Sequence, residues 1–197
     1  MESRPFNGRL GNMKIVFLVE ELSMKYLLEG ILPQIIPGGI EFKVVPHQGK
    51  QDLQKSIPIK LRSWNEPGVK FVIVHDKDSW DCRELKQELI RLCNQAGRPD
   101  TLVRIACNEL ESWYFGDLEA VGQAFDKDIS AFSEKSKYRV PDDIENPKSE
   151  IKKIVKGLQQ ISGAKAIANC MNIGRNTSHS FKVFIEGVLR ISEEMLA

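Results

Sequence analysis

Four short apolar runs alternate with helix-like segments in the first half of the chain, and this alternation constrains the fold more than any other feature. The runs lie at 14–19, 41–45, 70–74 and 101–106. The first, "KIVFLV", is continuous and rich in β-branched residues, which is typical of a strand covered on both faces. Repeated alternation of this kind predicts an α/β fold, with a parallel four-stranded sheet and helices on both faces.

Three segments between these runs predict helices. Residues 23–36 carry apolar side chains at helical spacing and end at a Pro-Gly-Gly turn. Residues 50–64 predict a second helix, in which Pro58 should cause a break or kink. Residues 81–97 predict the third, with one apolar face and Gly97 at its end. These helices would supply the covers that a buried parallel sheet needs.

After Cys107 the strand–helix alternation stops, and helical patterns follow. We expect one amphipathic helix at 148–161 and a final helix at 180–196 that buries Leu189 with four other apolar residues. The polar stretch 126–147 is bounded by proline and predicts a mobile loop. The predicted organisation is therefore a flexible extension at 1–12, an α/β core at 13–107 and a mainly helical extension at 108–197 packed on the core.

The composition is that of an ordinary soluble globular protein, with 42% hydrophobic and 28% charged residues. The polar start "MESRPFNGRLGN" lacks the apolar core of a signal peptide, and no apolar run is long enough to span a membrane. The four cysteines show neither CxxC spacing nor histidines at zinc-finger spacing, which indicates reduced thiols. We therefore expect a cytoplasmic protein without a membrane segment.

Charge is balanced over the whole chain, with 28 basic and 27 acidic residues, but its distribution is uneven. Residues 108–147 hold ten acidic and four basic residues, whereas residues 148–197 hold four acidic and eight basic ones. A basic C-terminal part fits an anionic partner such as nucleic acid, and it fits a solvated surface equally well. The candidate contacts to a nucleic-acid backbone are Lys50, Lys148, Lys152, Lys156 and Arg175.

Acidic residues follow three of the four predicted strands. They are Glu20 and Glu21 after the first strand, Asp76 and Asp78 after the third, and Glu109 and Glu111 after the fourth. Parallel sheets bind ligands at the carboxyl ends of their strands, and like charges gathered there repel unless a cation holds them. All of these groups are hard oxygen ligands. The expected ion is therefore Mg²⁺ or Mn²⁺, with Ca²⁺ as an alternative.

The stretch "VIVHDKDSWDC" is the centre of this hypothesis. Asp76 and Asp78 project the same way if the chain stays extended. Glu20 can share an ion with them only if the first and third strands are neighbours, since adjacent strands lie about 4.8 Å apart. The alternative is a helix cap by Asp78 or Ser79, which would explain one aspartate but not both.

Other residues near the strand ends have plainer interpretations. His75 is more often a hydrogen-bonded strand-end histidine than a metal ligand. The aromatic run from Trp113 to Phe115 is more often core than a stacking platform. Glu109 and Glu111 are candidate metal ligands, and they would also suit the start of a helix.

The glutamate of "VFLVEE" followed by "VIVHDKD" resembles the pattern of the Toprim fold, which topoisomerases, DnaG-type primases and OLD-family nucleases share. The segments "RIACNELESWYFGD" and "SHSFKVFIEGVL" resemble a family of uncharacterised bacterial proteins with a Toprim-like core. Members of that family are often encoded beside ABC-type or AAA-type ATPases in phage-defence loci. The Toprim glutamate is commonly followed by glycine, whereas this chain has Glu21.

The resemblance implies that Asp76 and Asp78 hold one or two Mg²⁺ or Mn²⁺ ions, with Glu20 as a further ligand or a general acid–base. It also implies hydrolysis of phosphodiester bonds in DNA or RNA, with an ATPase as partner. No tyrosine makes a good case for a topoisomerase nucleophile, so hydrolysis is favoured over strand passage.

Three alternatives remain open on the sequence. A haloacid dehalogenase phosphatase carries its DxD on the first strand, whereas here it follows the third. A nucleotide-sugar transferase needs a second half longer than this chain offers. The third alternative is a non-catalytic Toprim-like module that binds metal or nucleic acid and acts as the partner of an ATPase. Loss of metal-dependent cleavage in Asp76→Ala would separate the enzyme from this module.

Overall fold

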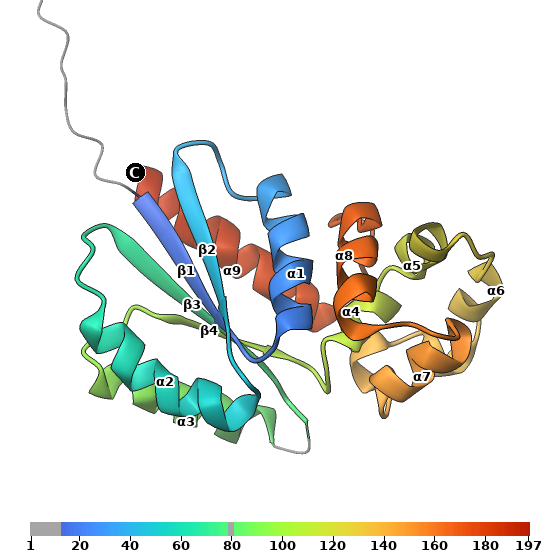
Figure 1. Cartoon of the computed structure of the whole chain (residues 1–197), viewed down its shortest axis with the longest axis horizontal. Coiled ribbons are helices and arrows are strands. Elements are labelled where there is room, and N and C mark those ends of the chain that lie inside the picture. The colour runs from blue at the N-terminus through green and yellow to red at the C-terminus, as the bar shows by residue number, and fades with distance from the viewer. Residues whose placement is uncertain (1–12, 79–80) are drawn as a thin grey trace, which may run out of the picture.

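The computed structural model describes residues 13–78 and 81–197, and the predicted extension 1–12 lies outside them. Its centre is a parallel sheet with the strand order β2-β1-β3-β4 (Figure 1). The strands are β1 (Met13–Val19), β2 (Ile40–Pro46), β3 (Val69–Asp76) and β4 (Leu102–Ala106). The predicted α/β fold class is confirmed, and β1 lies next to β3 as a shared site requires.

Helices connect these strands as predicted. They are α1 (Leu22–Ile31), α2 (Lys50–Ser63) and α3 (Cys82–Gln95), and a short 3₁₀ turn, η1 (Leu32–Gln34), extends the first. Of the break or kink expected at Pro58, the break does not occur, since α2 continues to Ser63; the kink stays a prediction. Leu53, Ile57 and Leu61 on this helix are buried. Their packing outweighs the loss of one backbone hydrogen bond at the proline.

Each face of the sheet has its own apolar core. On one face α2 and α3 cover Leu18, which packs in one cluster with Ile57 and Leu89. On the other face lie α1 and the C-terminal helix α9 (His179–Leu196), where the rings of Phe17 and Phe184 meet at 6.3 Å between centroids. Neighbouring strand residues point to opposite faces. Burial of both faces therefore explains why the strands appear as continuous apolar runs.

The chain after β4 forms a group of helices beside one end of the sheet, followed by the return of α9 to it (Figure 1). The shorter ones are α4 (Glu111–Phe115), α5 (Leu118–Phe125), α6 (Ser130–Ser133), α7 (Pro147–Ile154) and α8 (Gln160–Cys170). Two 3₁₀ turns, η2 (Ser136–Tyr138) and η3 (Pro141–Asp143), lie in the segment predicted as a mobile loop. That segment buries Ile129 and Ile144, and its mobility stays a prediction.

Two details of the predicted C-terminal helices are wrong. The single helix expected at 148–161 is two helices, because Gly157 takes a left-handed φ of 81° between α7 and α8. Leu158 is buried although it lies outside both helices, so it continues the helical spacing of apolar residues in the sequence. In α9, Leu189 is 38% exposed, and Ile191 is buried instead.

The aromatic run from Trp113 to Phe115 ends α4 and belongs to the core, as predicted. Trp113 is fully buried and stacks on Phe184, with 5.2 Å between ring centroids. Its indole Nε1 donates a hydrogen bond to Oγ of Ser180 at 2.9 Å. These contacts fix the start of the helical group against α9.

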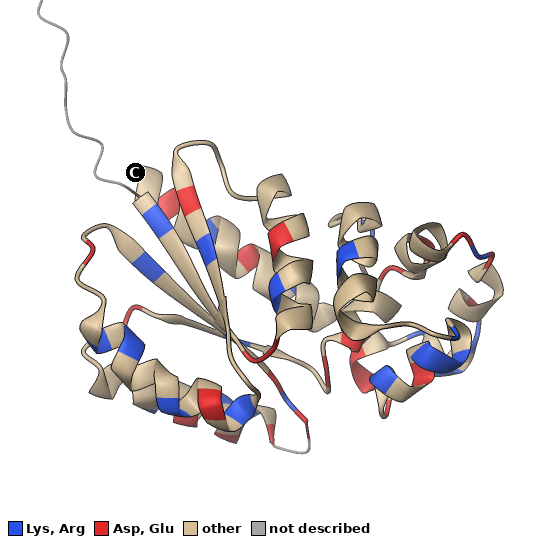
Figure 2. Ribbon diagram, viewed as in Figure 1, with Lys and Arg blue, Asp and Glu red and all other residues tan. Residues whose placement is uncertain are grey.

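The four cysteines are free thiols. Within the described ranges, no helix has the length and apolar character needed to cross a membrane. Figure 2 shows acidic residues in the turn that follows β1 and charges of both signs on α7. The first of these features marks the place where the predicted acidic cluster should be sought.

Candidate metal centre at the strand ends

Glu20 and Asp76 lie at the carboxyl ends of the neighbouring strands β1 and β3. The two strands pair in parallel with Val19 opposite Val74, so Glu20 is level with His75, the residue before Asp76. The carboxylate Oε2 of Glu20 lies 3.3 Å from Nδ1 of His75. The strand neighbourhood that a shared metal site demands is therefore present.

Two carboxylate oxygens in this group are orphaned. Oε2 of Glu20 and Oδ1 of Asp76 are buried and have no hydrogen-bond partner among the described residues. Asp76 is 8% exposed, so water can reach its carboxylate only to a small extent. Burying an unpaired carboxylate oxygen carries a large desolvation cost. Two such oxygens from adjacent strands are the donor set that a hard divalent cation prefers.

Burial raises the pKa of the carboxylates in this group, and repulsion between their charges adds to the effect. Burial raises the pKa of Glu20 to about 7, and the charge of Asp78 adds to this effect. Burial raises the pKa of Asp76 well above its usual range, and the charges of Glu20 and Glu111 reinforce it. Burial also raises the pKa of Glu111 to about 7. A bound cation would relieve the repulsion and favour the ionised forms.

Asp78 leaves the extended backbone conformation that sequence analysis expected, and its role as a metal ligand stays a prediction. The strand ends at Asp76, and Asp78 takes a left-handed φ of 50°. Its backbone N–H donates to the carbonyl oxygen of Asn108 at 2.9 Å, which turns the chain toward the segment after β4. Its Oδ2 accepts a hydrogen bond from Nζ of Lys50 at 3.0 Å. Lys50 therefore neutralises Asp78, and its predicted contact to a phosphate stays a prediction.

The cap interpretation of this segment is wrong for Asp78. The N-cap of α3 is Asp81, whose carboxylate accepts from the backbone N–H groups of Arg83 and Glu84 at 2.8 and 3.1 Å. Ser79 lies outside the described residues. Capping therefore explains neither Asp76 nor Asp78.

His75 is fully buried and hydrogen-bonded, which agrees with the plainer of its two interpretations. Its Nδ1 lies 2.6 Å from the carbonyl oxygen of Asp76, and its Nε2 lies 3.3 Å from Nε2 of Gln54. The Gln54 amide donates to Nε2, so the ring proton stays on Nδ1 and is donated to the carbonyl. Burial lowers the pKa of His75 and keeps the ring neutral. Gln54 was not predicted as a partner of His75, and only its position on the helix after β2 could have indicated it.

The two glutamates after β4 have different roles. Glu111 begins α4 and is 2% exposed, beside the pair formed by Glu20 and Asp76. Glu109 instead accepts a hydrogen bond from the backbone N–H of Lys148 at 3.0 Å, at the start of α7. Tyr114, predicted only as a core residue, has a buried hydroxyl with no partner among the described residues. Burial raises the pKa of Tyr114, and the charges of this acidic group add to the effect.

The predicted basic contacts lie on different elements of the fold. Lys148 and Lys152 lie on α7, whereas Lys156 lies beyond its end. Arg175 is occupied by Asp117, whose Oδ1 accepts from Nε at 2.7 Å. A role of these residues in binding nucleic acid stays a prediction.

A pocket of about 400 Å³ opens beside the strand ends, between the segments that follow β3 and β4 and the start of α7. Its lining residues are Asp78, Asn108, Glu109, Glu145, Asn146 and Pro147. In residues 13–78 and 81–197, no three His, Cys, Asp or Glu side chains lie close enough to hold an ion by themselves. Mg²⁺ often binds to one or two carboxylates plus water and substrate phosphates. Glu20 and Asp76 fit that kind of site, whereas Asp78 is held in an ion pair with Lys50.

Comparison with known proteins agrees with the fold. The family model described as a domain of unknown function (DUF4276) matches residues 19–189. The structure resembles the C-terminal region of the OLD protein of Burkholderia pseudomallei, with a TM-score of 0.54 and 16% sequence identity over 93% of this chain and 98% of that chain. This likeness confirms the Toprim-like α/β fold and, at such identity, shows the fold alone. No curated protein matches the sequence.

Proposed function

Because the chain belongs to the family described as a domain of unknown function (DUF4276), its chemistry must be inferred from its site, and we propose that it is a Mg²⁺- or Mn²⁺-dependent phosphodiesterase acting on DNA or RNA. The observation that carries this proposal is the pair of orphaned, buried carboxylate oxygens on Glu20 and Asp76. The Toprim-like fold supports it, and the pocket lined by Asp78 opens near the same end of the sheet.

In this proposal Oδ1 of Asp76 and Oε2 of Glu20 hold the ion. The ion, when bound, would hold the phosphodiester, stabilise charge on its oxygens and activate water. Neutral His75 donates a hydrogen bond from its Nδ1–H to the carbonyl oxygen of Asp76, and this bond fixes the end of β3. Glu111 is a third carboxylate, and its charge adds to the effect of burial, which raises the pKa of Asp76. It is a candidate to accept a proton during the reaction.

The substrate and partner belong to the proposal as well. Lys148 and Lys152 are candidates to bind the phosphate backbone, because α7 begins at the rim of the pocket. An ABC-type or AAA-type ATPase as partner, in a system of phage defence, follows from the family resemblance. Neither the proposed phosphate contacts nor the proposed ATPase partner depends on the geometry of the metal centre.

A second candidate is a non-catalytic module that binds metal or nucleic acid for a partner ATPase. The ion pair between Lys50 and Asp78 favours this module, because the pair engages a carboxylate that the nuclease hypothesis assigned to the metal. Glu21 favours it too, since it stands where a Toprim site commonly has glycine.

Calorimetric titration with Mn²⁺ tests the metal centre before any search for a substrate. We expect the wild type to bind, Glu20→Gln/Asp76→Asn to lose binding, and Asp78→Asn to retain it. The matched control is Glu186→Gln/Glu193→Gln, which removes two exposed charges of α9 and should bind normally. A folded wild type that binds no Mn²⁺ would reject the proposed centre.

Cleavage of single- and double-stranded DNA and RNA in Mn²⁺ then separates the two candidates. Metal-dependent cleavage that is lost in Asp76→Ala supports the enzyme. Binding of Mn²⁺ without cleavage, in the presence of the partner ATPase as well, supports the module.

A further inference from the structure

A second pocket, of about 500 Å³, lies in the helical part of the molecule and shares no lining residue with the pocket at the strand ends. It is bordered by α5, α6 and the loop before α9. One wall is apolar: Leu118 and Ile129 line it together with Phe115 and Tyr138, whose rings stack at 4.9 Å with 20° between their planes. Its volume is that of a small-molecule site, for which a range of roughly 300–1,000 Å³ is usual.

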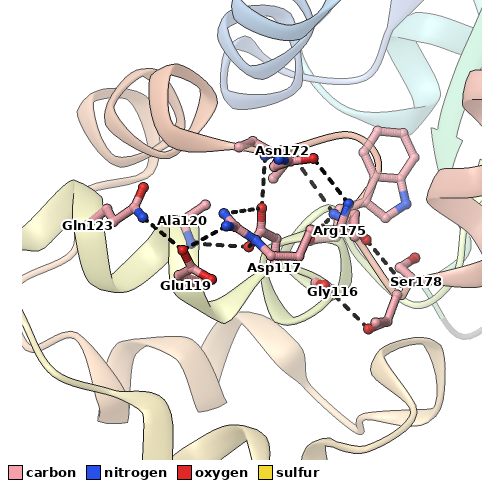
Figure 3. Close-up of polar contacts among 12 residues, drawn as sticks. Gly116, Asp117, Glu119, Ala120, Gln123, Asn172, Arg175 and Ser178 are labelled. Carbon is pink, nitrogen blue, oxygen red and sulfur yellow. Dashed lines mark hydrogen bonds and ion pairs between the residues drawn. The ribbon is translucent and has the colours of Figure 1, made fainter.

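The floor of this pocket is a network of fully satisfied polar groups (Figure 3). Asp117 is 2% exposed, and both of its oxygens accept hydrogen bonds from Arg175, at 2.7 and 3.1 Å. The backbone N–H groups of Ala120 and Asn172 donate to the same carboxylate at 3.1 and 2.9 Å. Glu119 holds the remaining arm of the guanidinium at 2.7 Å. This bonding fixes the floor before any ligand arrives.

The rim of the pocket carries two cations without anionic partners. Lys127 and Arg139 are exposed, and within the described ranges neither side chain forms an ion pair or a hydrogen bond. Asp128, a carboxylate that also lines the pocket, accepts hydrogen bonds from the backbone N–H and the hydroxyl of Ser130. An apolar, aromatic wall beside two available cations suits a ligand with a flat ring and an anionic group.

We propose that this pocket binds one nucleotide unit, with the base against the wall of Phe115 and Tyr138 and the phosphate at Lys127 and Arg139. A free mononucleotide and a nucleotide within a single strand offer the same chemistry. The proposal does not rest on the metal centre, because none of the groups involved belongs to it.

The test is a titration of the ¹⁵N-labelled full chain followed by NMR, in EDTA so that no metal contributes. The probes are AMP, adenosine and a single-stranded (dA)₁₂. We expect AMP to shift the amide signals of Gly116, Gly122 and Thr177, which line the pocket. Adenosine, which lacks the phosphate, should bind at least tenfold more weakly. Shifts by AMP alone identify a free nucleotide as ligand, and shifts by both AMP and (dA)₁₂ identify a unit of a strand.

Charge reversal at the rim provides the matched comparison. Lys127→Glu/Arg139→Glu should weaken AMP at least tenfold. Lys55→Glu/Lys86→Glu changes the net charge equally on exposed positions of α2 and α3, and it should leave AMP binding unchanged. Equal weakening in both variants, shifts outside the pocket, or no shift with either AMP or (dA)₁₂ would overturn the proposal.

Discussion

Replacing Glu20 by glutamine should stabilise the metal-free protein at pH 8, although it removes a residue of the proposed metal centre. The carboxylate of Glu20 is buried beside Asp76, and its Oε2 has no hydrogen-bond partner in the described part of the chain. At pH 8 the folded state must carry this charge, whereas the unfolded chain exposes it to water. Glutamine keeps the shape and omits the charge.

The magnitude follows from the pKa of Glu20, which burial and the charge of Asp78 raise from 4.5 to about 7. At about 1.4 kcal/mol per pH unit, full ionisation costs the folded state at most ~3.5 kcal/mol. The side chain keeps 15% of its surface exposed, so we expect about 1–2 kcal/mol. At about 2–4 °C per kcal/mol for a chain of this size, the melting temperature should rise by about 2–8 °C.

The pH dependence has a definite sign. Below pH 4.5 Glu20 is protonated in both the folded and the unfolded state, so the wild type and Glu20→Gln respond to pH alike. As pH rises from 4.5 toward 7, the unfolded chain releases its proton first and the wild type loses stability. Above about pH 7 the advantage of the variant is complete and constant.

The assay is a set of thermal melts in EDTA at pH 5 and pH 8, repeated with saturating Mn²⁺. We expect the variant to melt higher at pH 8 in EDTA and the order to reverse in Mn²⁺, because only the wild type gains binding energy. Glu193→Gln on α9 is the control and should change neither melt. A variant that melts at or below the wild type at pH 8 in EDTA would refute the reasoning.

Three further predictions concern other contacts. Lys50→Gln releases Asp78 from its ion pair and should raise the Mn²⁺ affinity about threefold to tenfold by calorimetry; an unchanged affinity would mean that Asp78 stays outside the centre. Glu150→Gln should cost about 1 kcal/mol at pH 7 in urea unfolding. Hydrogen bonds from two lysines lower the pKa of Glu150 to about 2, so this loss should shrink as pH falls from 4.5 toward 2, and a constant loss would contradict it. Trp113→Phe removes the hydrogen bond to Ser180 at 2.9 Å and part of a buried ring, which should cost about 2 kcal/mol in urea unfolding; a cost under about 0.5 kcal/mol would contradict the packing role.

The fold was predictable because both faces of the sheet are buried. Each strand then needs apolar residues without interruption, and the helices between them need one apolar stripe. The neighbourhood of Glu20 and Asp76 could be foreseen for the same reason. Residues at the carboxyl ends of parallel strands share one edge of the sheet, whichever loops connect them.

The position of Asp78 could not be predicted from its local sequence. Its backbone is turned by a hydrogen bond to Asn108, which lies thirty residues further along the chain, after β4. The binding of Arg175 to Asp117 likewise spans 58 residues and left no periodic signal. The continuation of α2 through Pro58 depends on burial that only the folded sheet provides.

The contact between Phe17 and Phe184 has a consequence for synthesis on the ribosome. The sheet face beneath α2 and α3 draws its buried residues from Val16 to Ile105, so it can close while the chain is still growing. The opposite face stays open until α9 has left the exit tunnel. During that interval the nascent chain presents an apolar surface to its surroundings, and chaperone capture should be strongest on ribosome-bound chains that stop before Ser178.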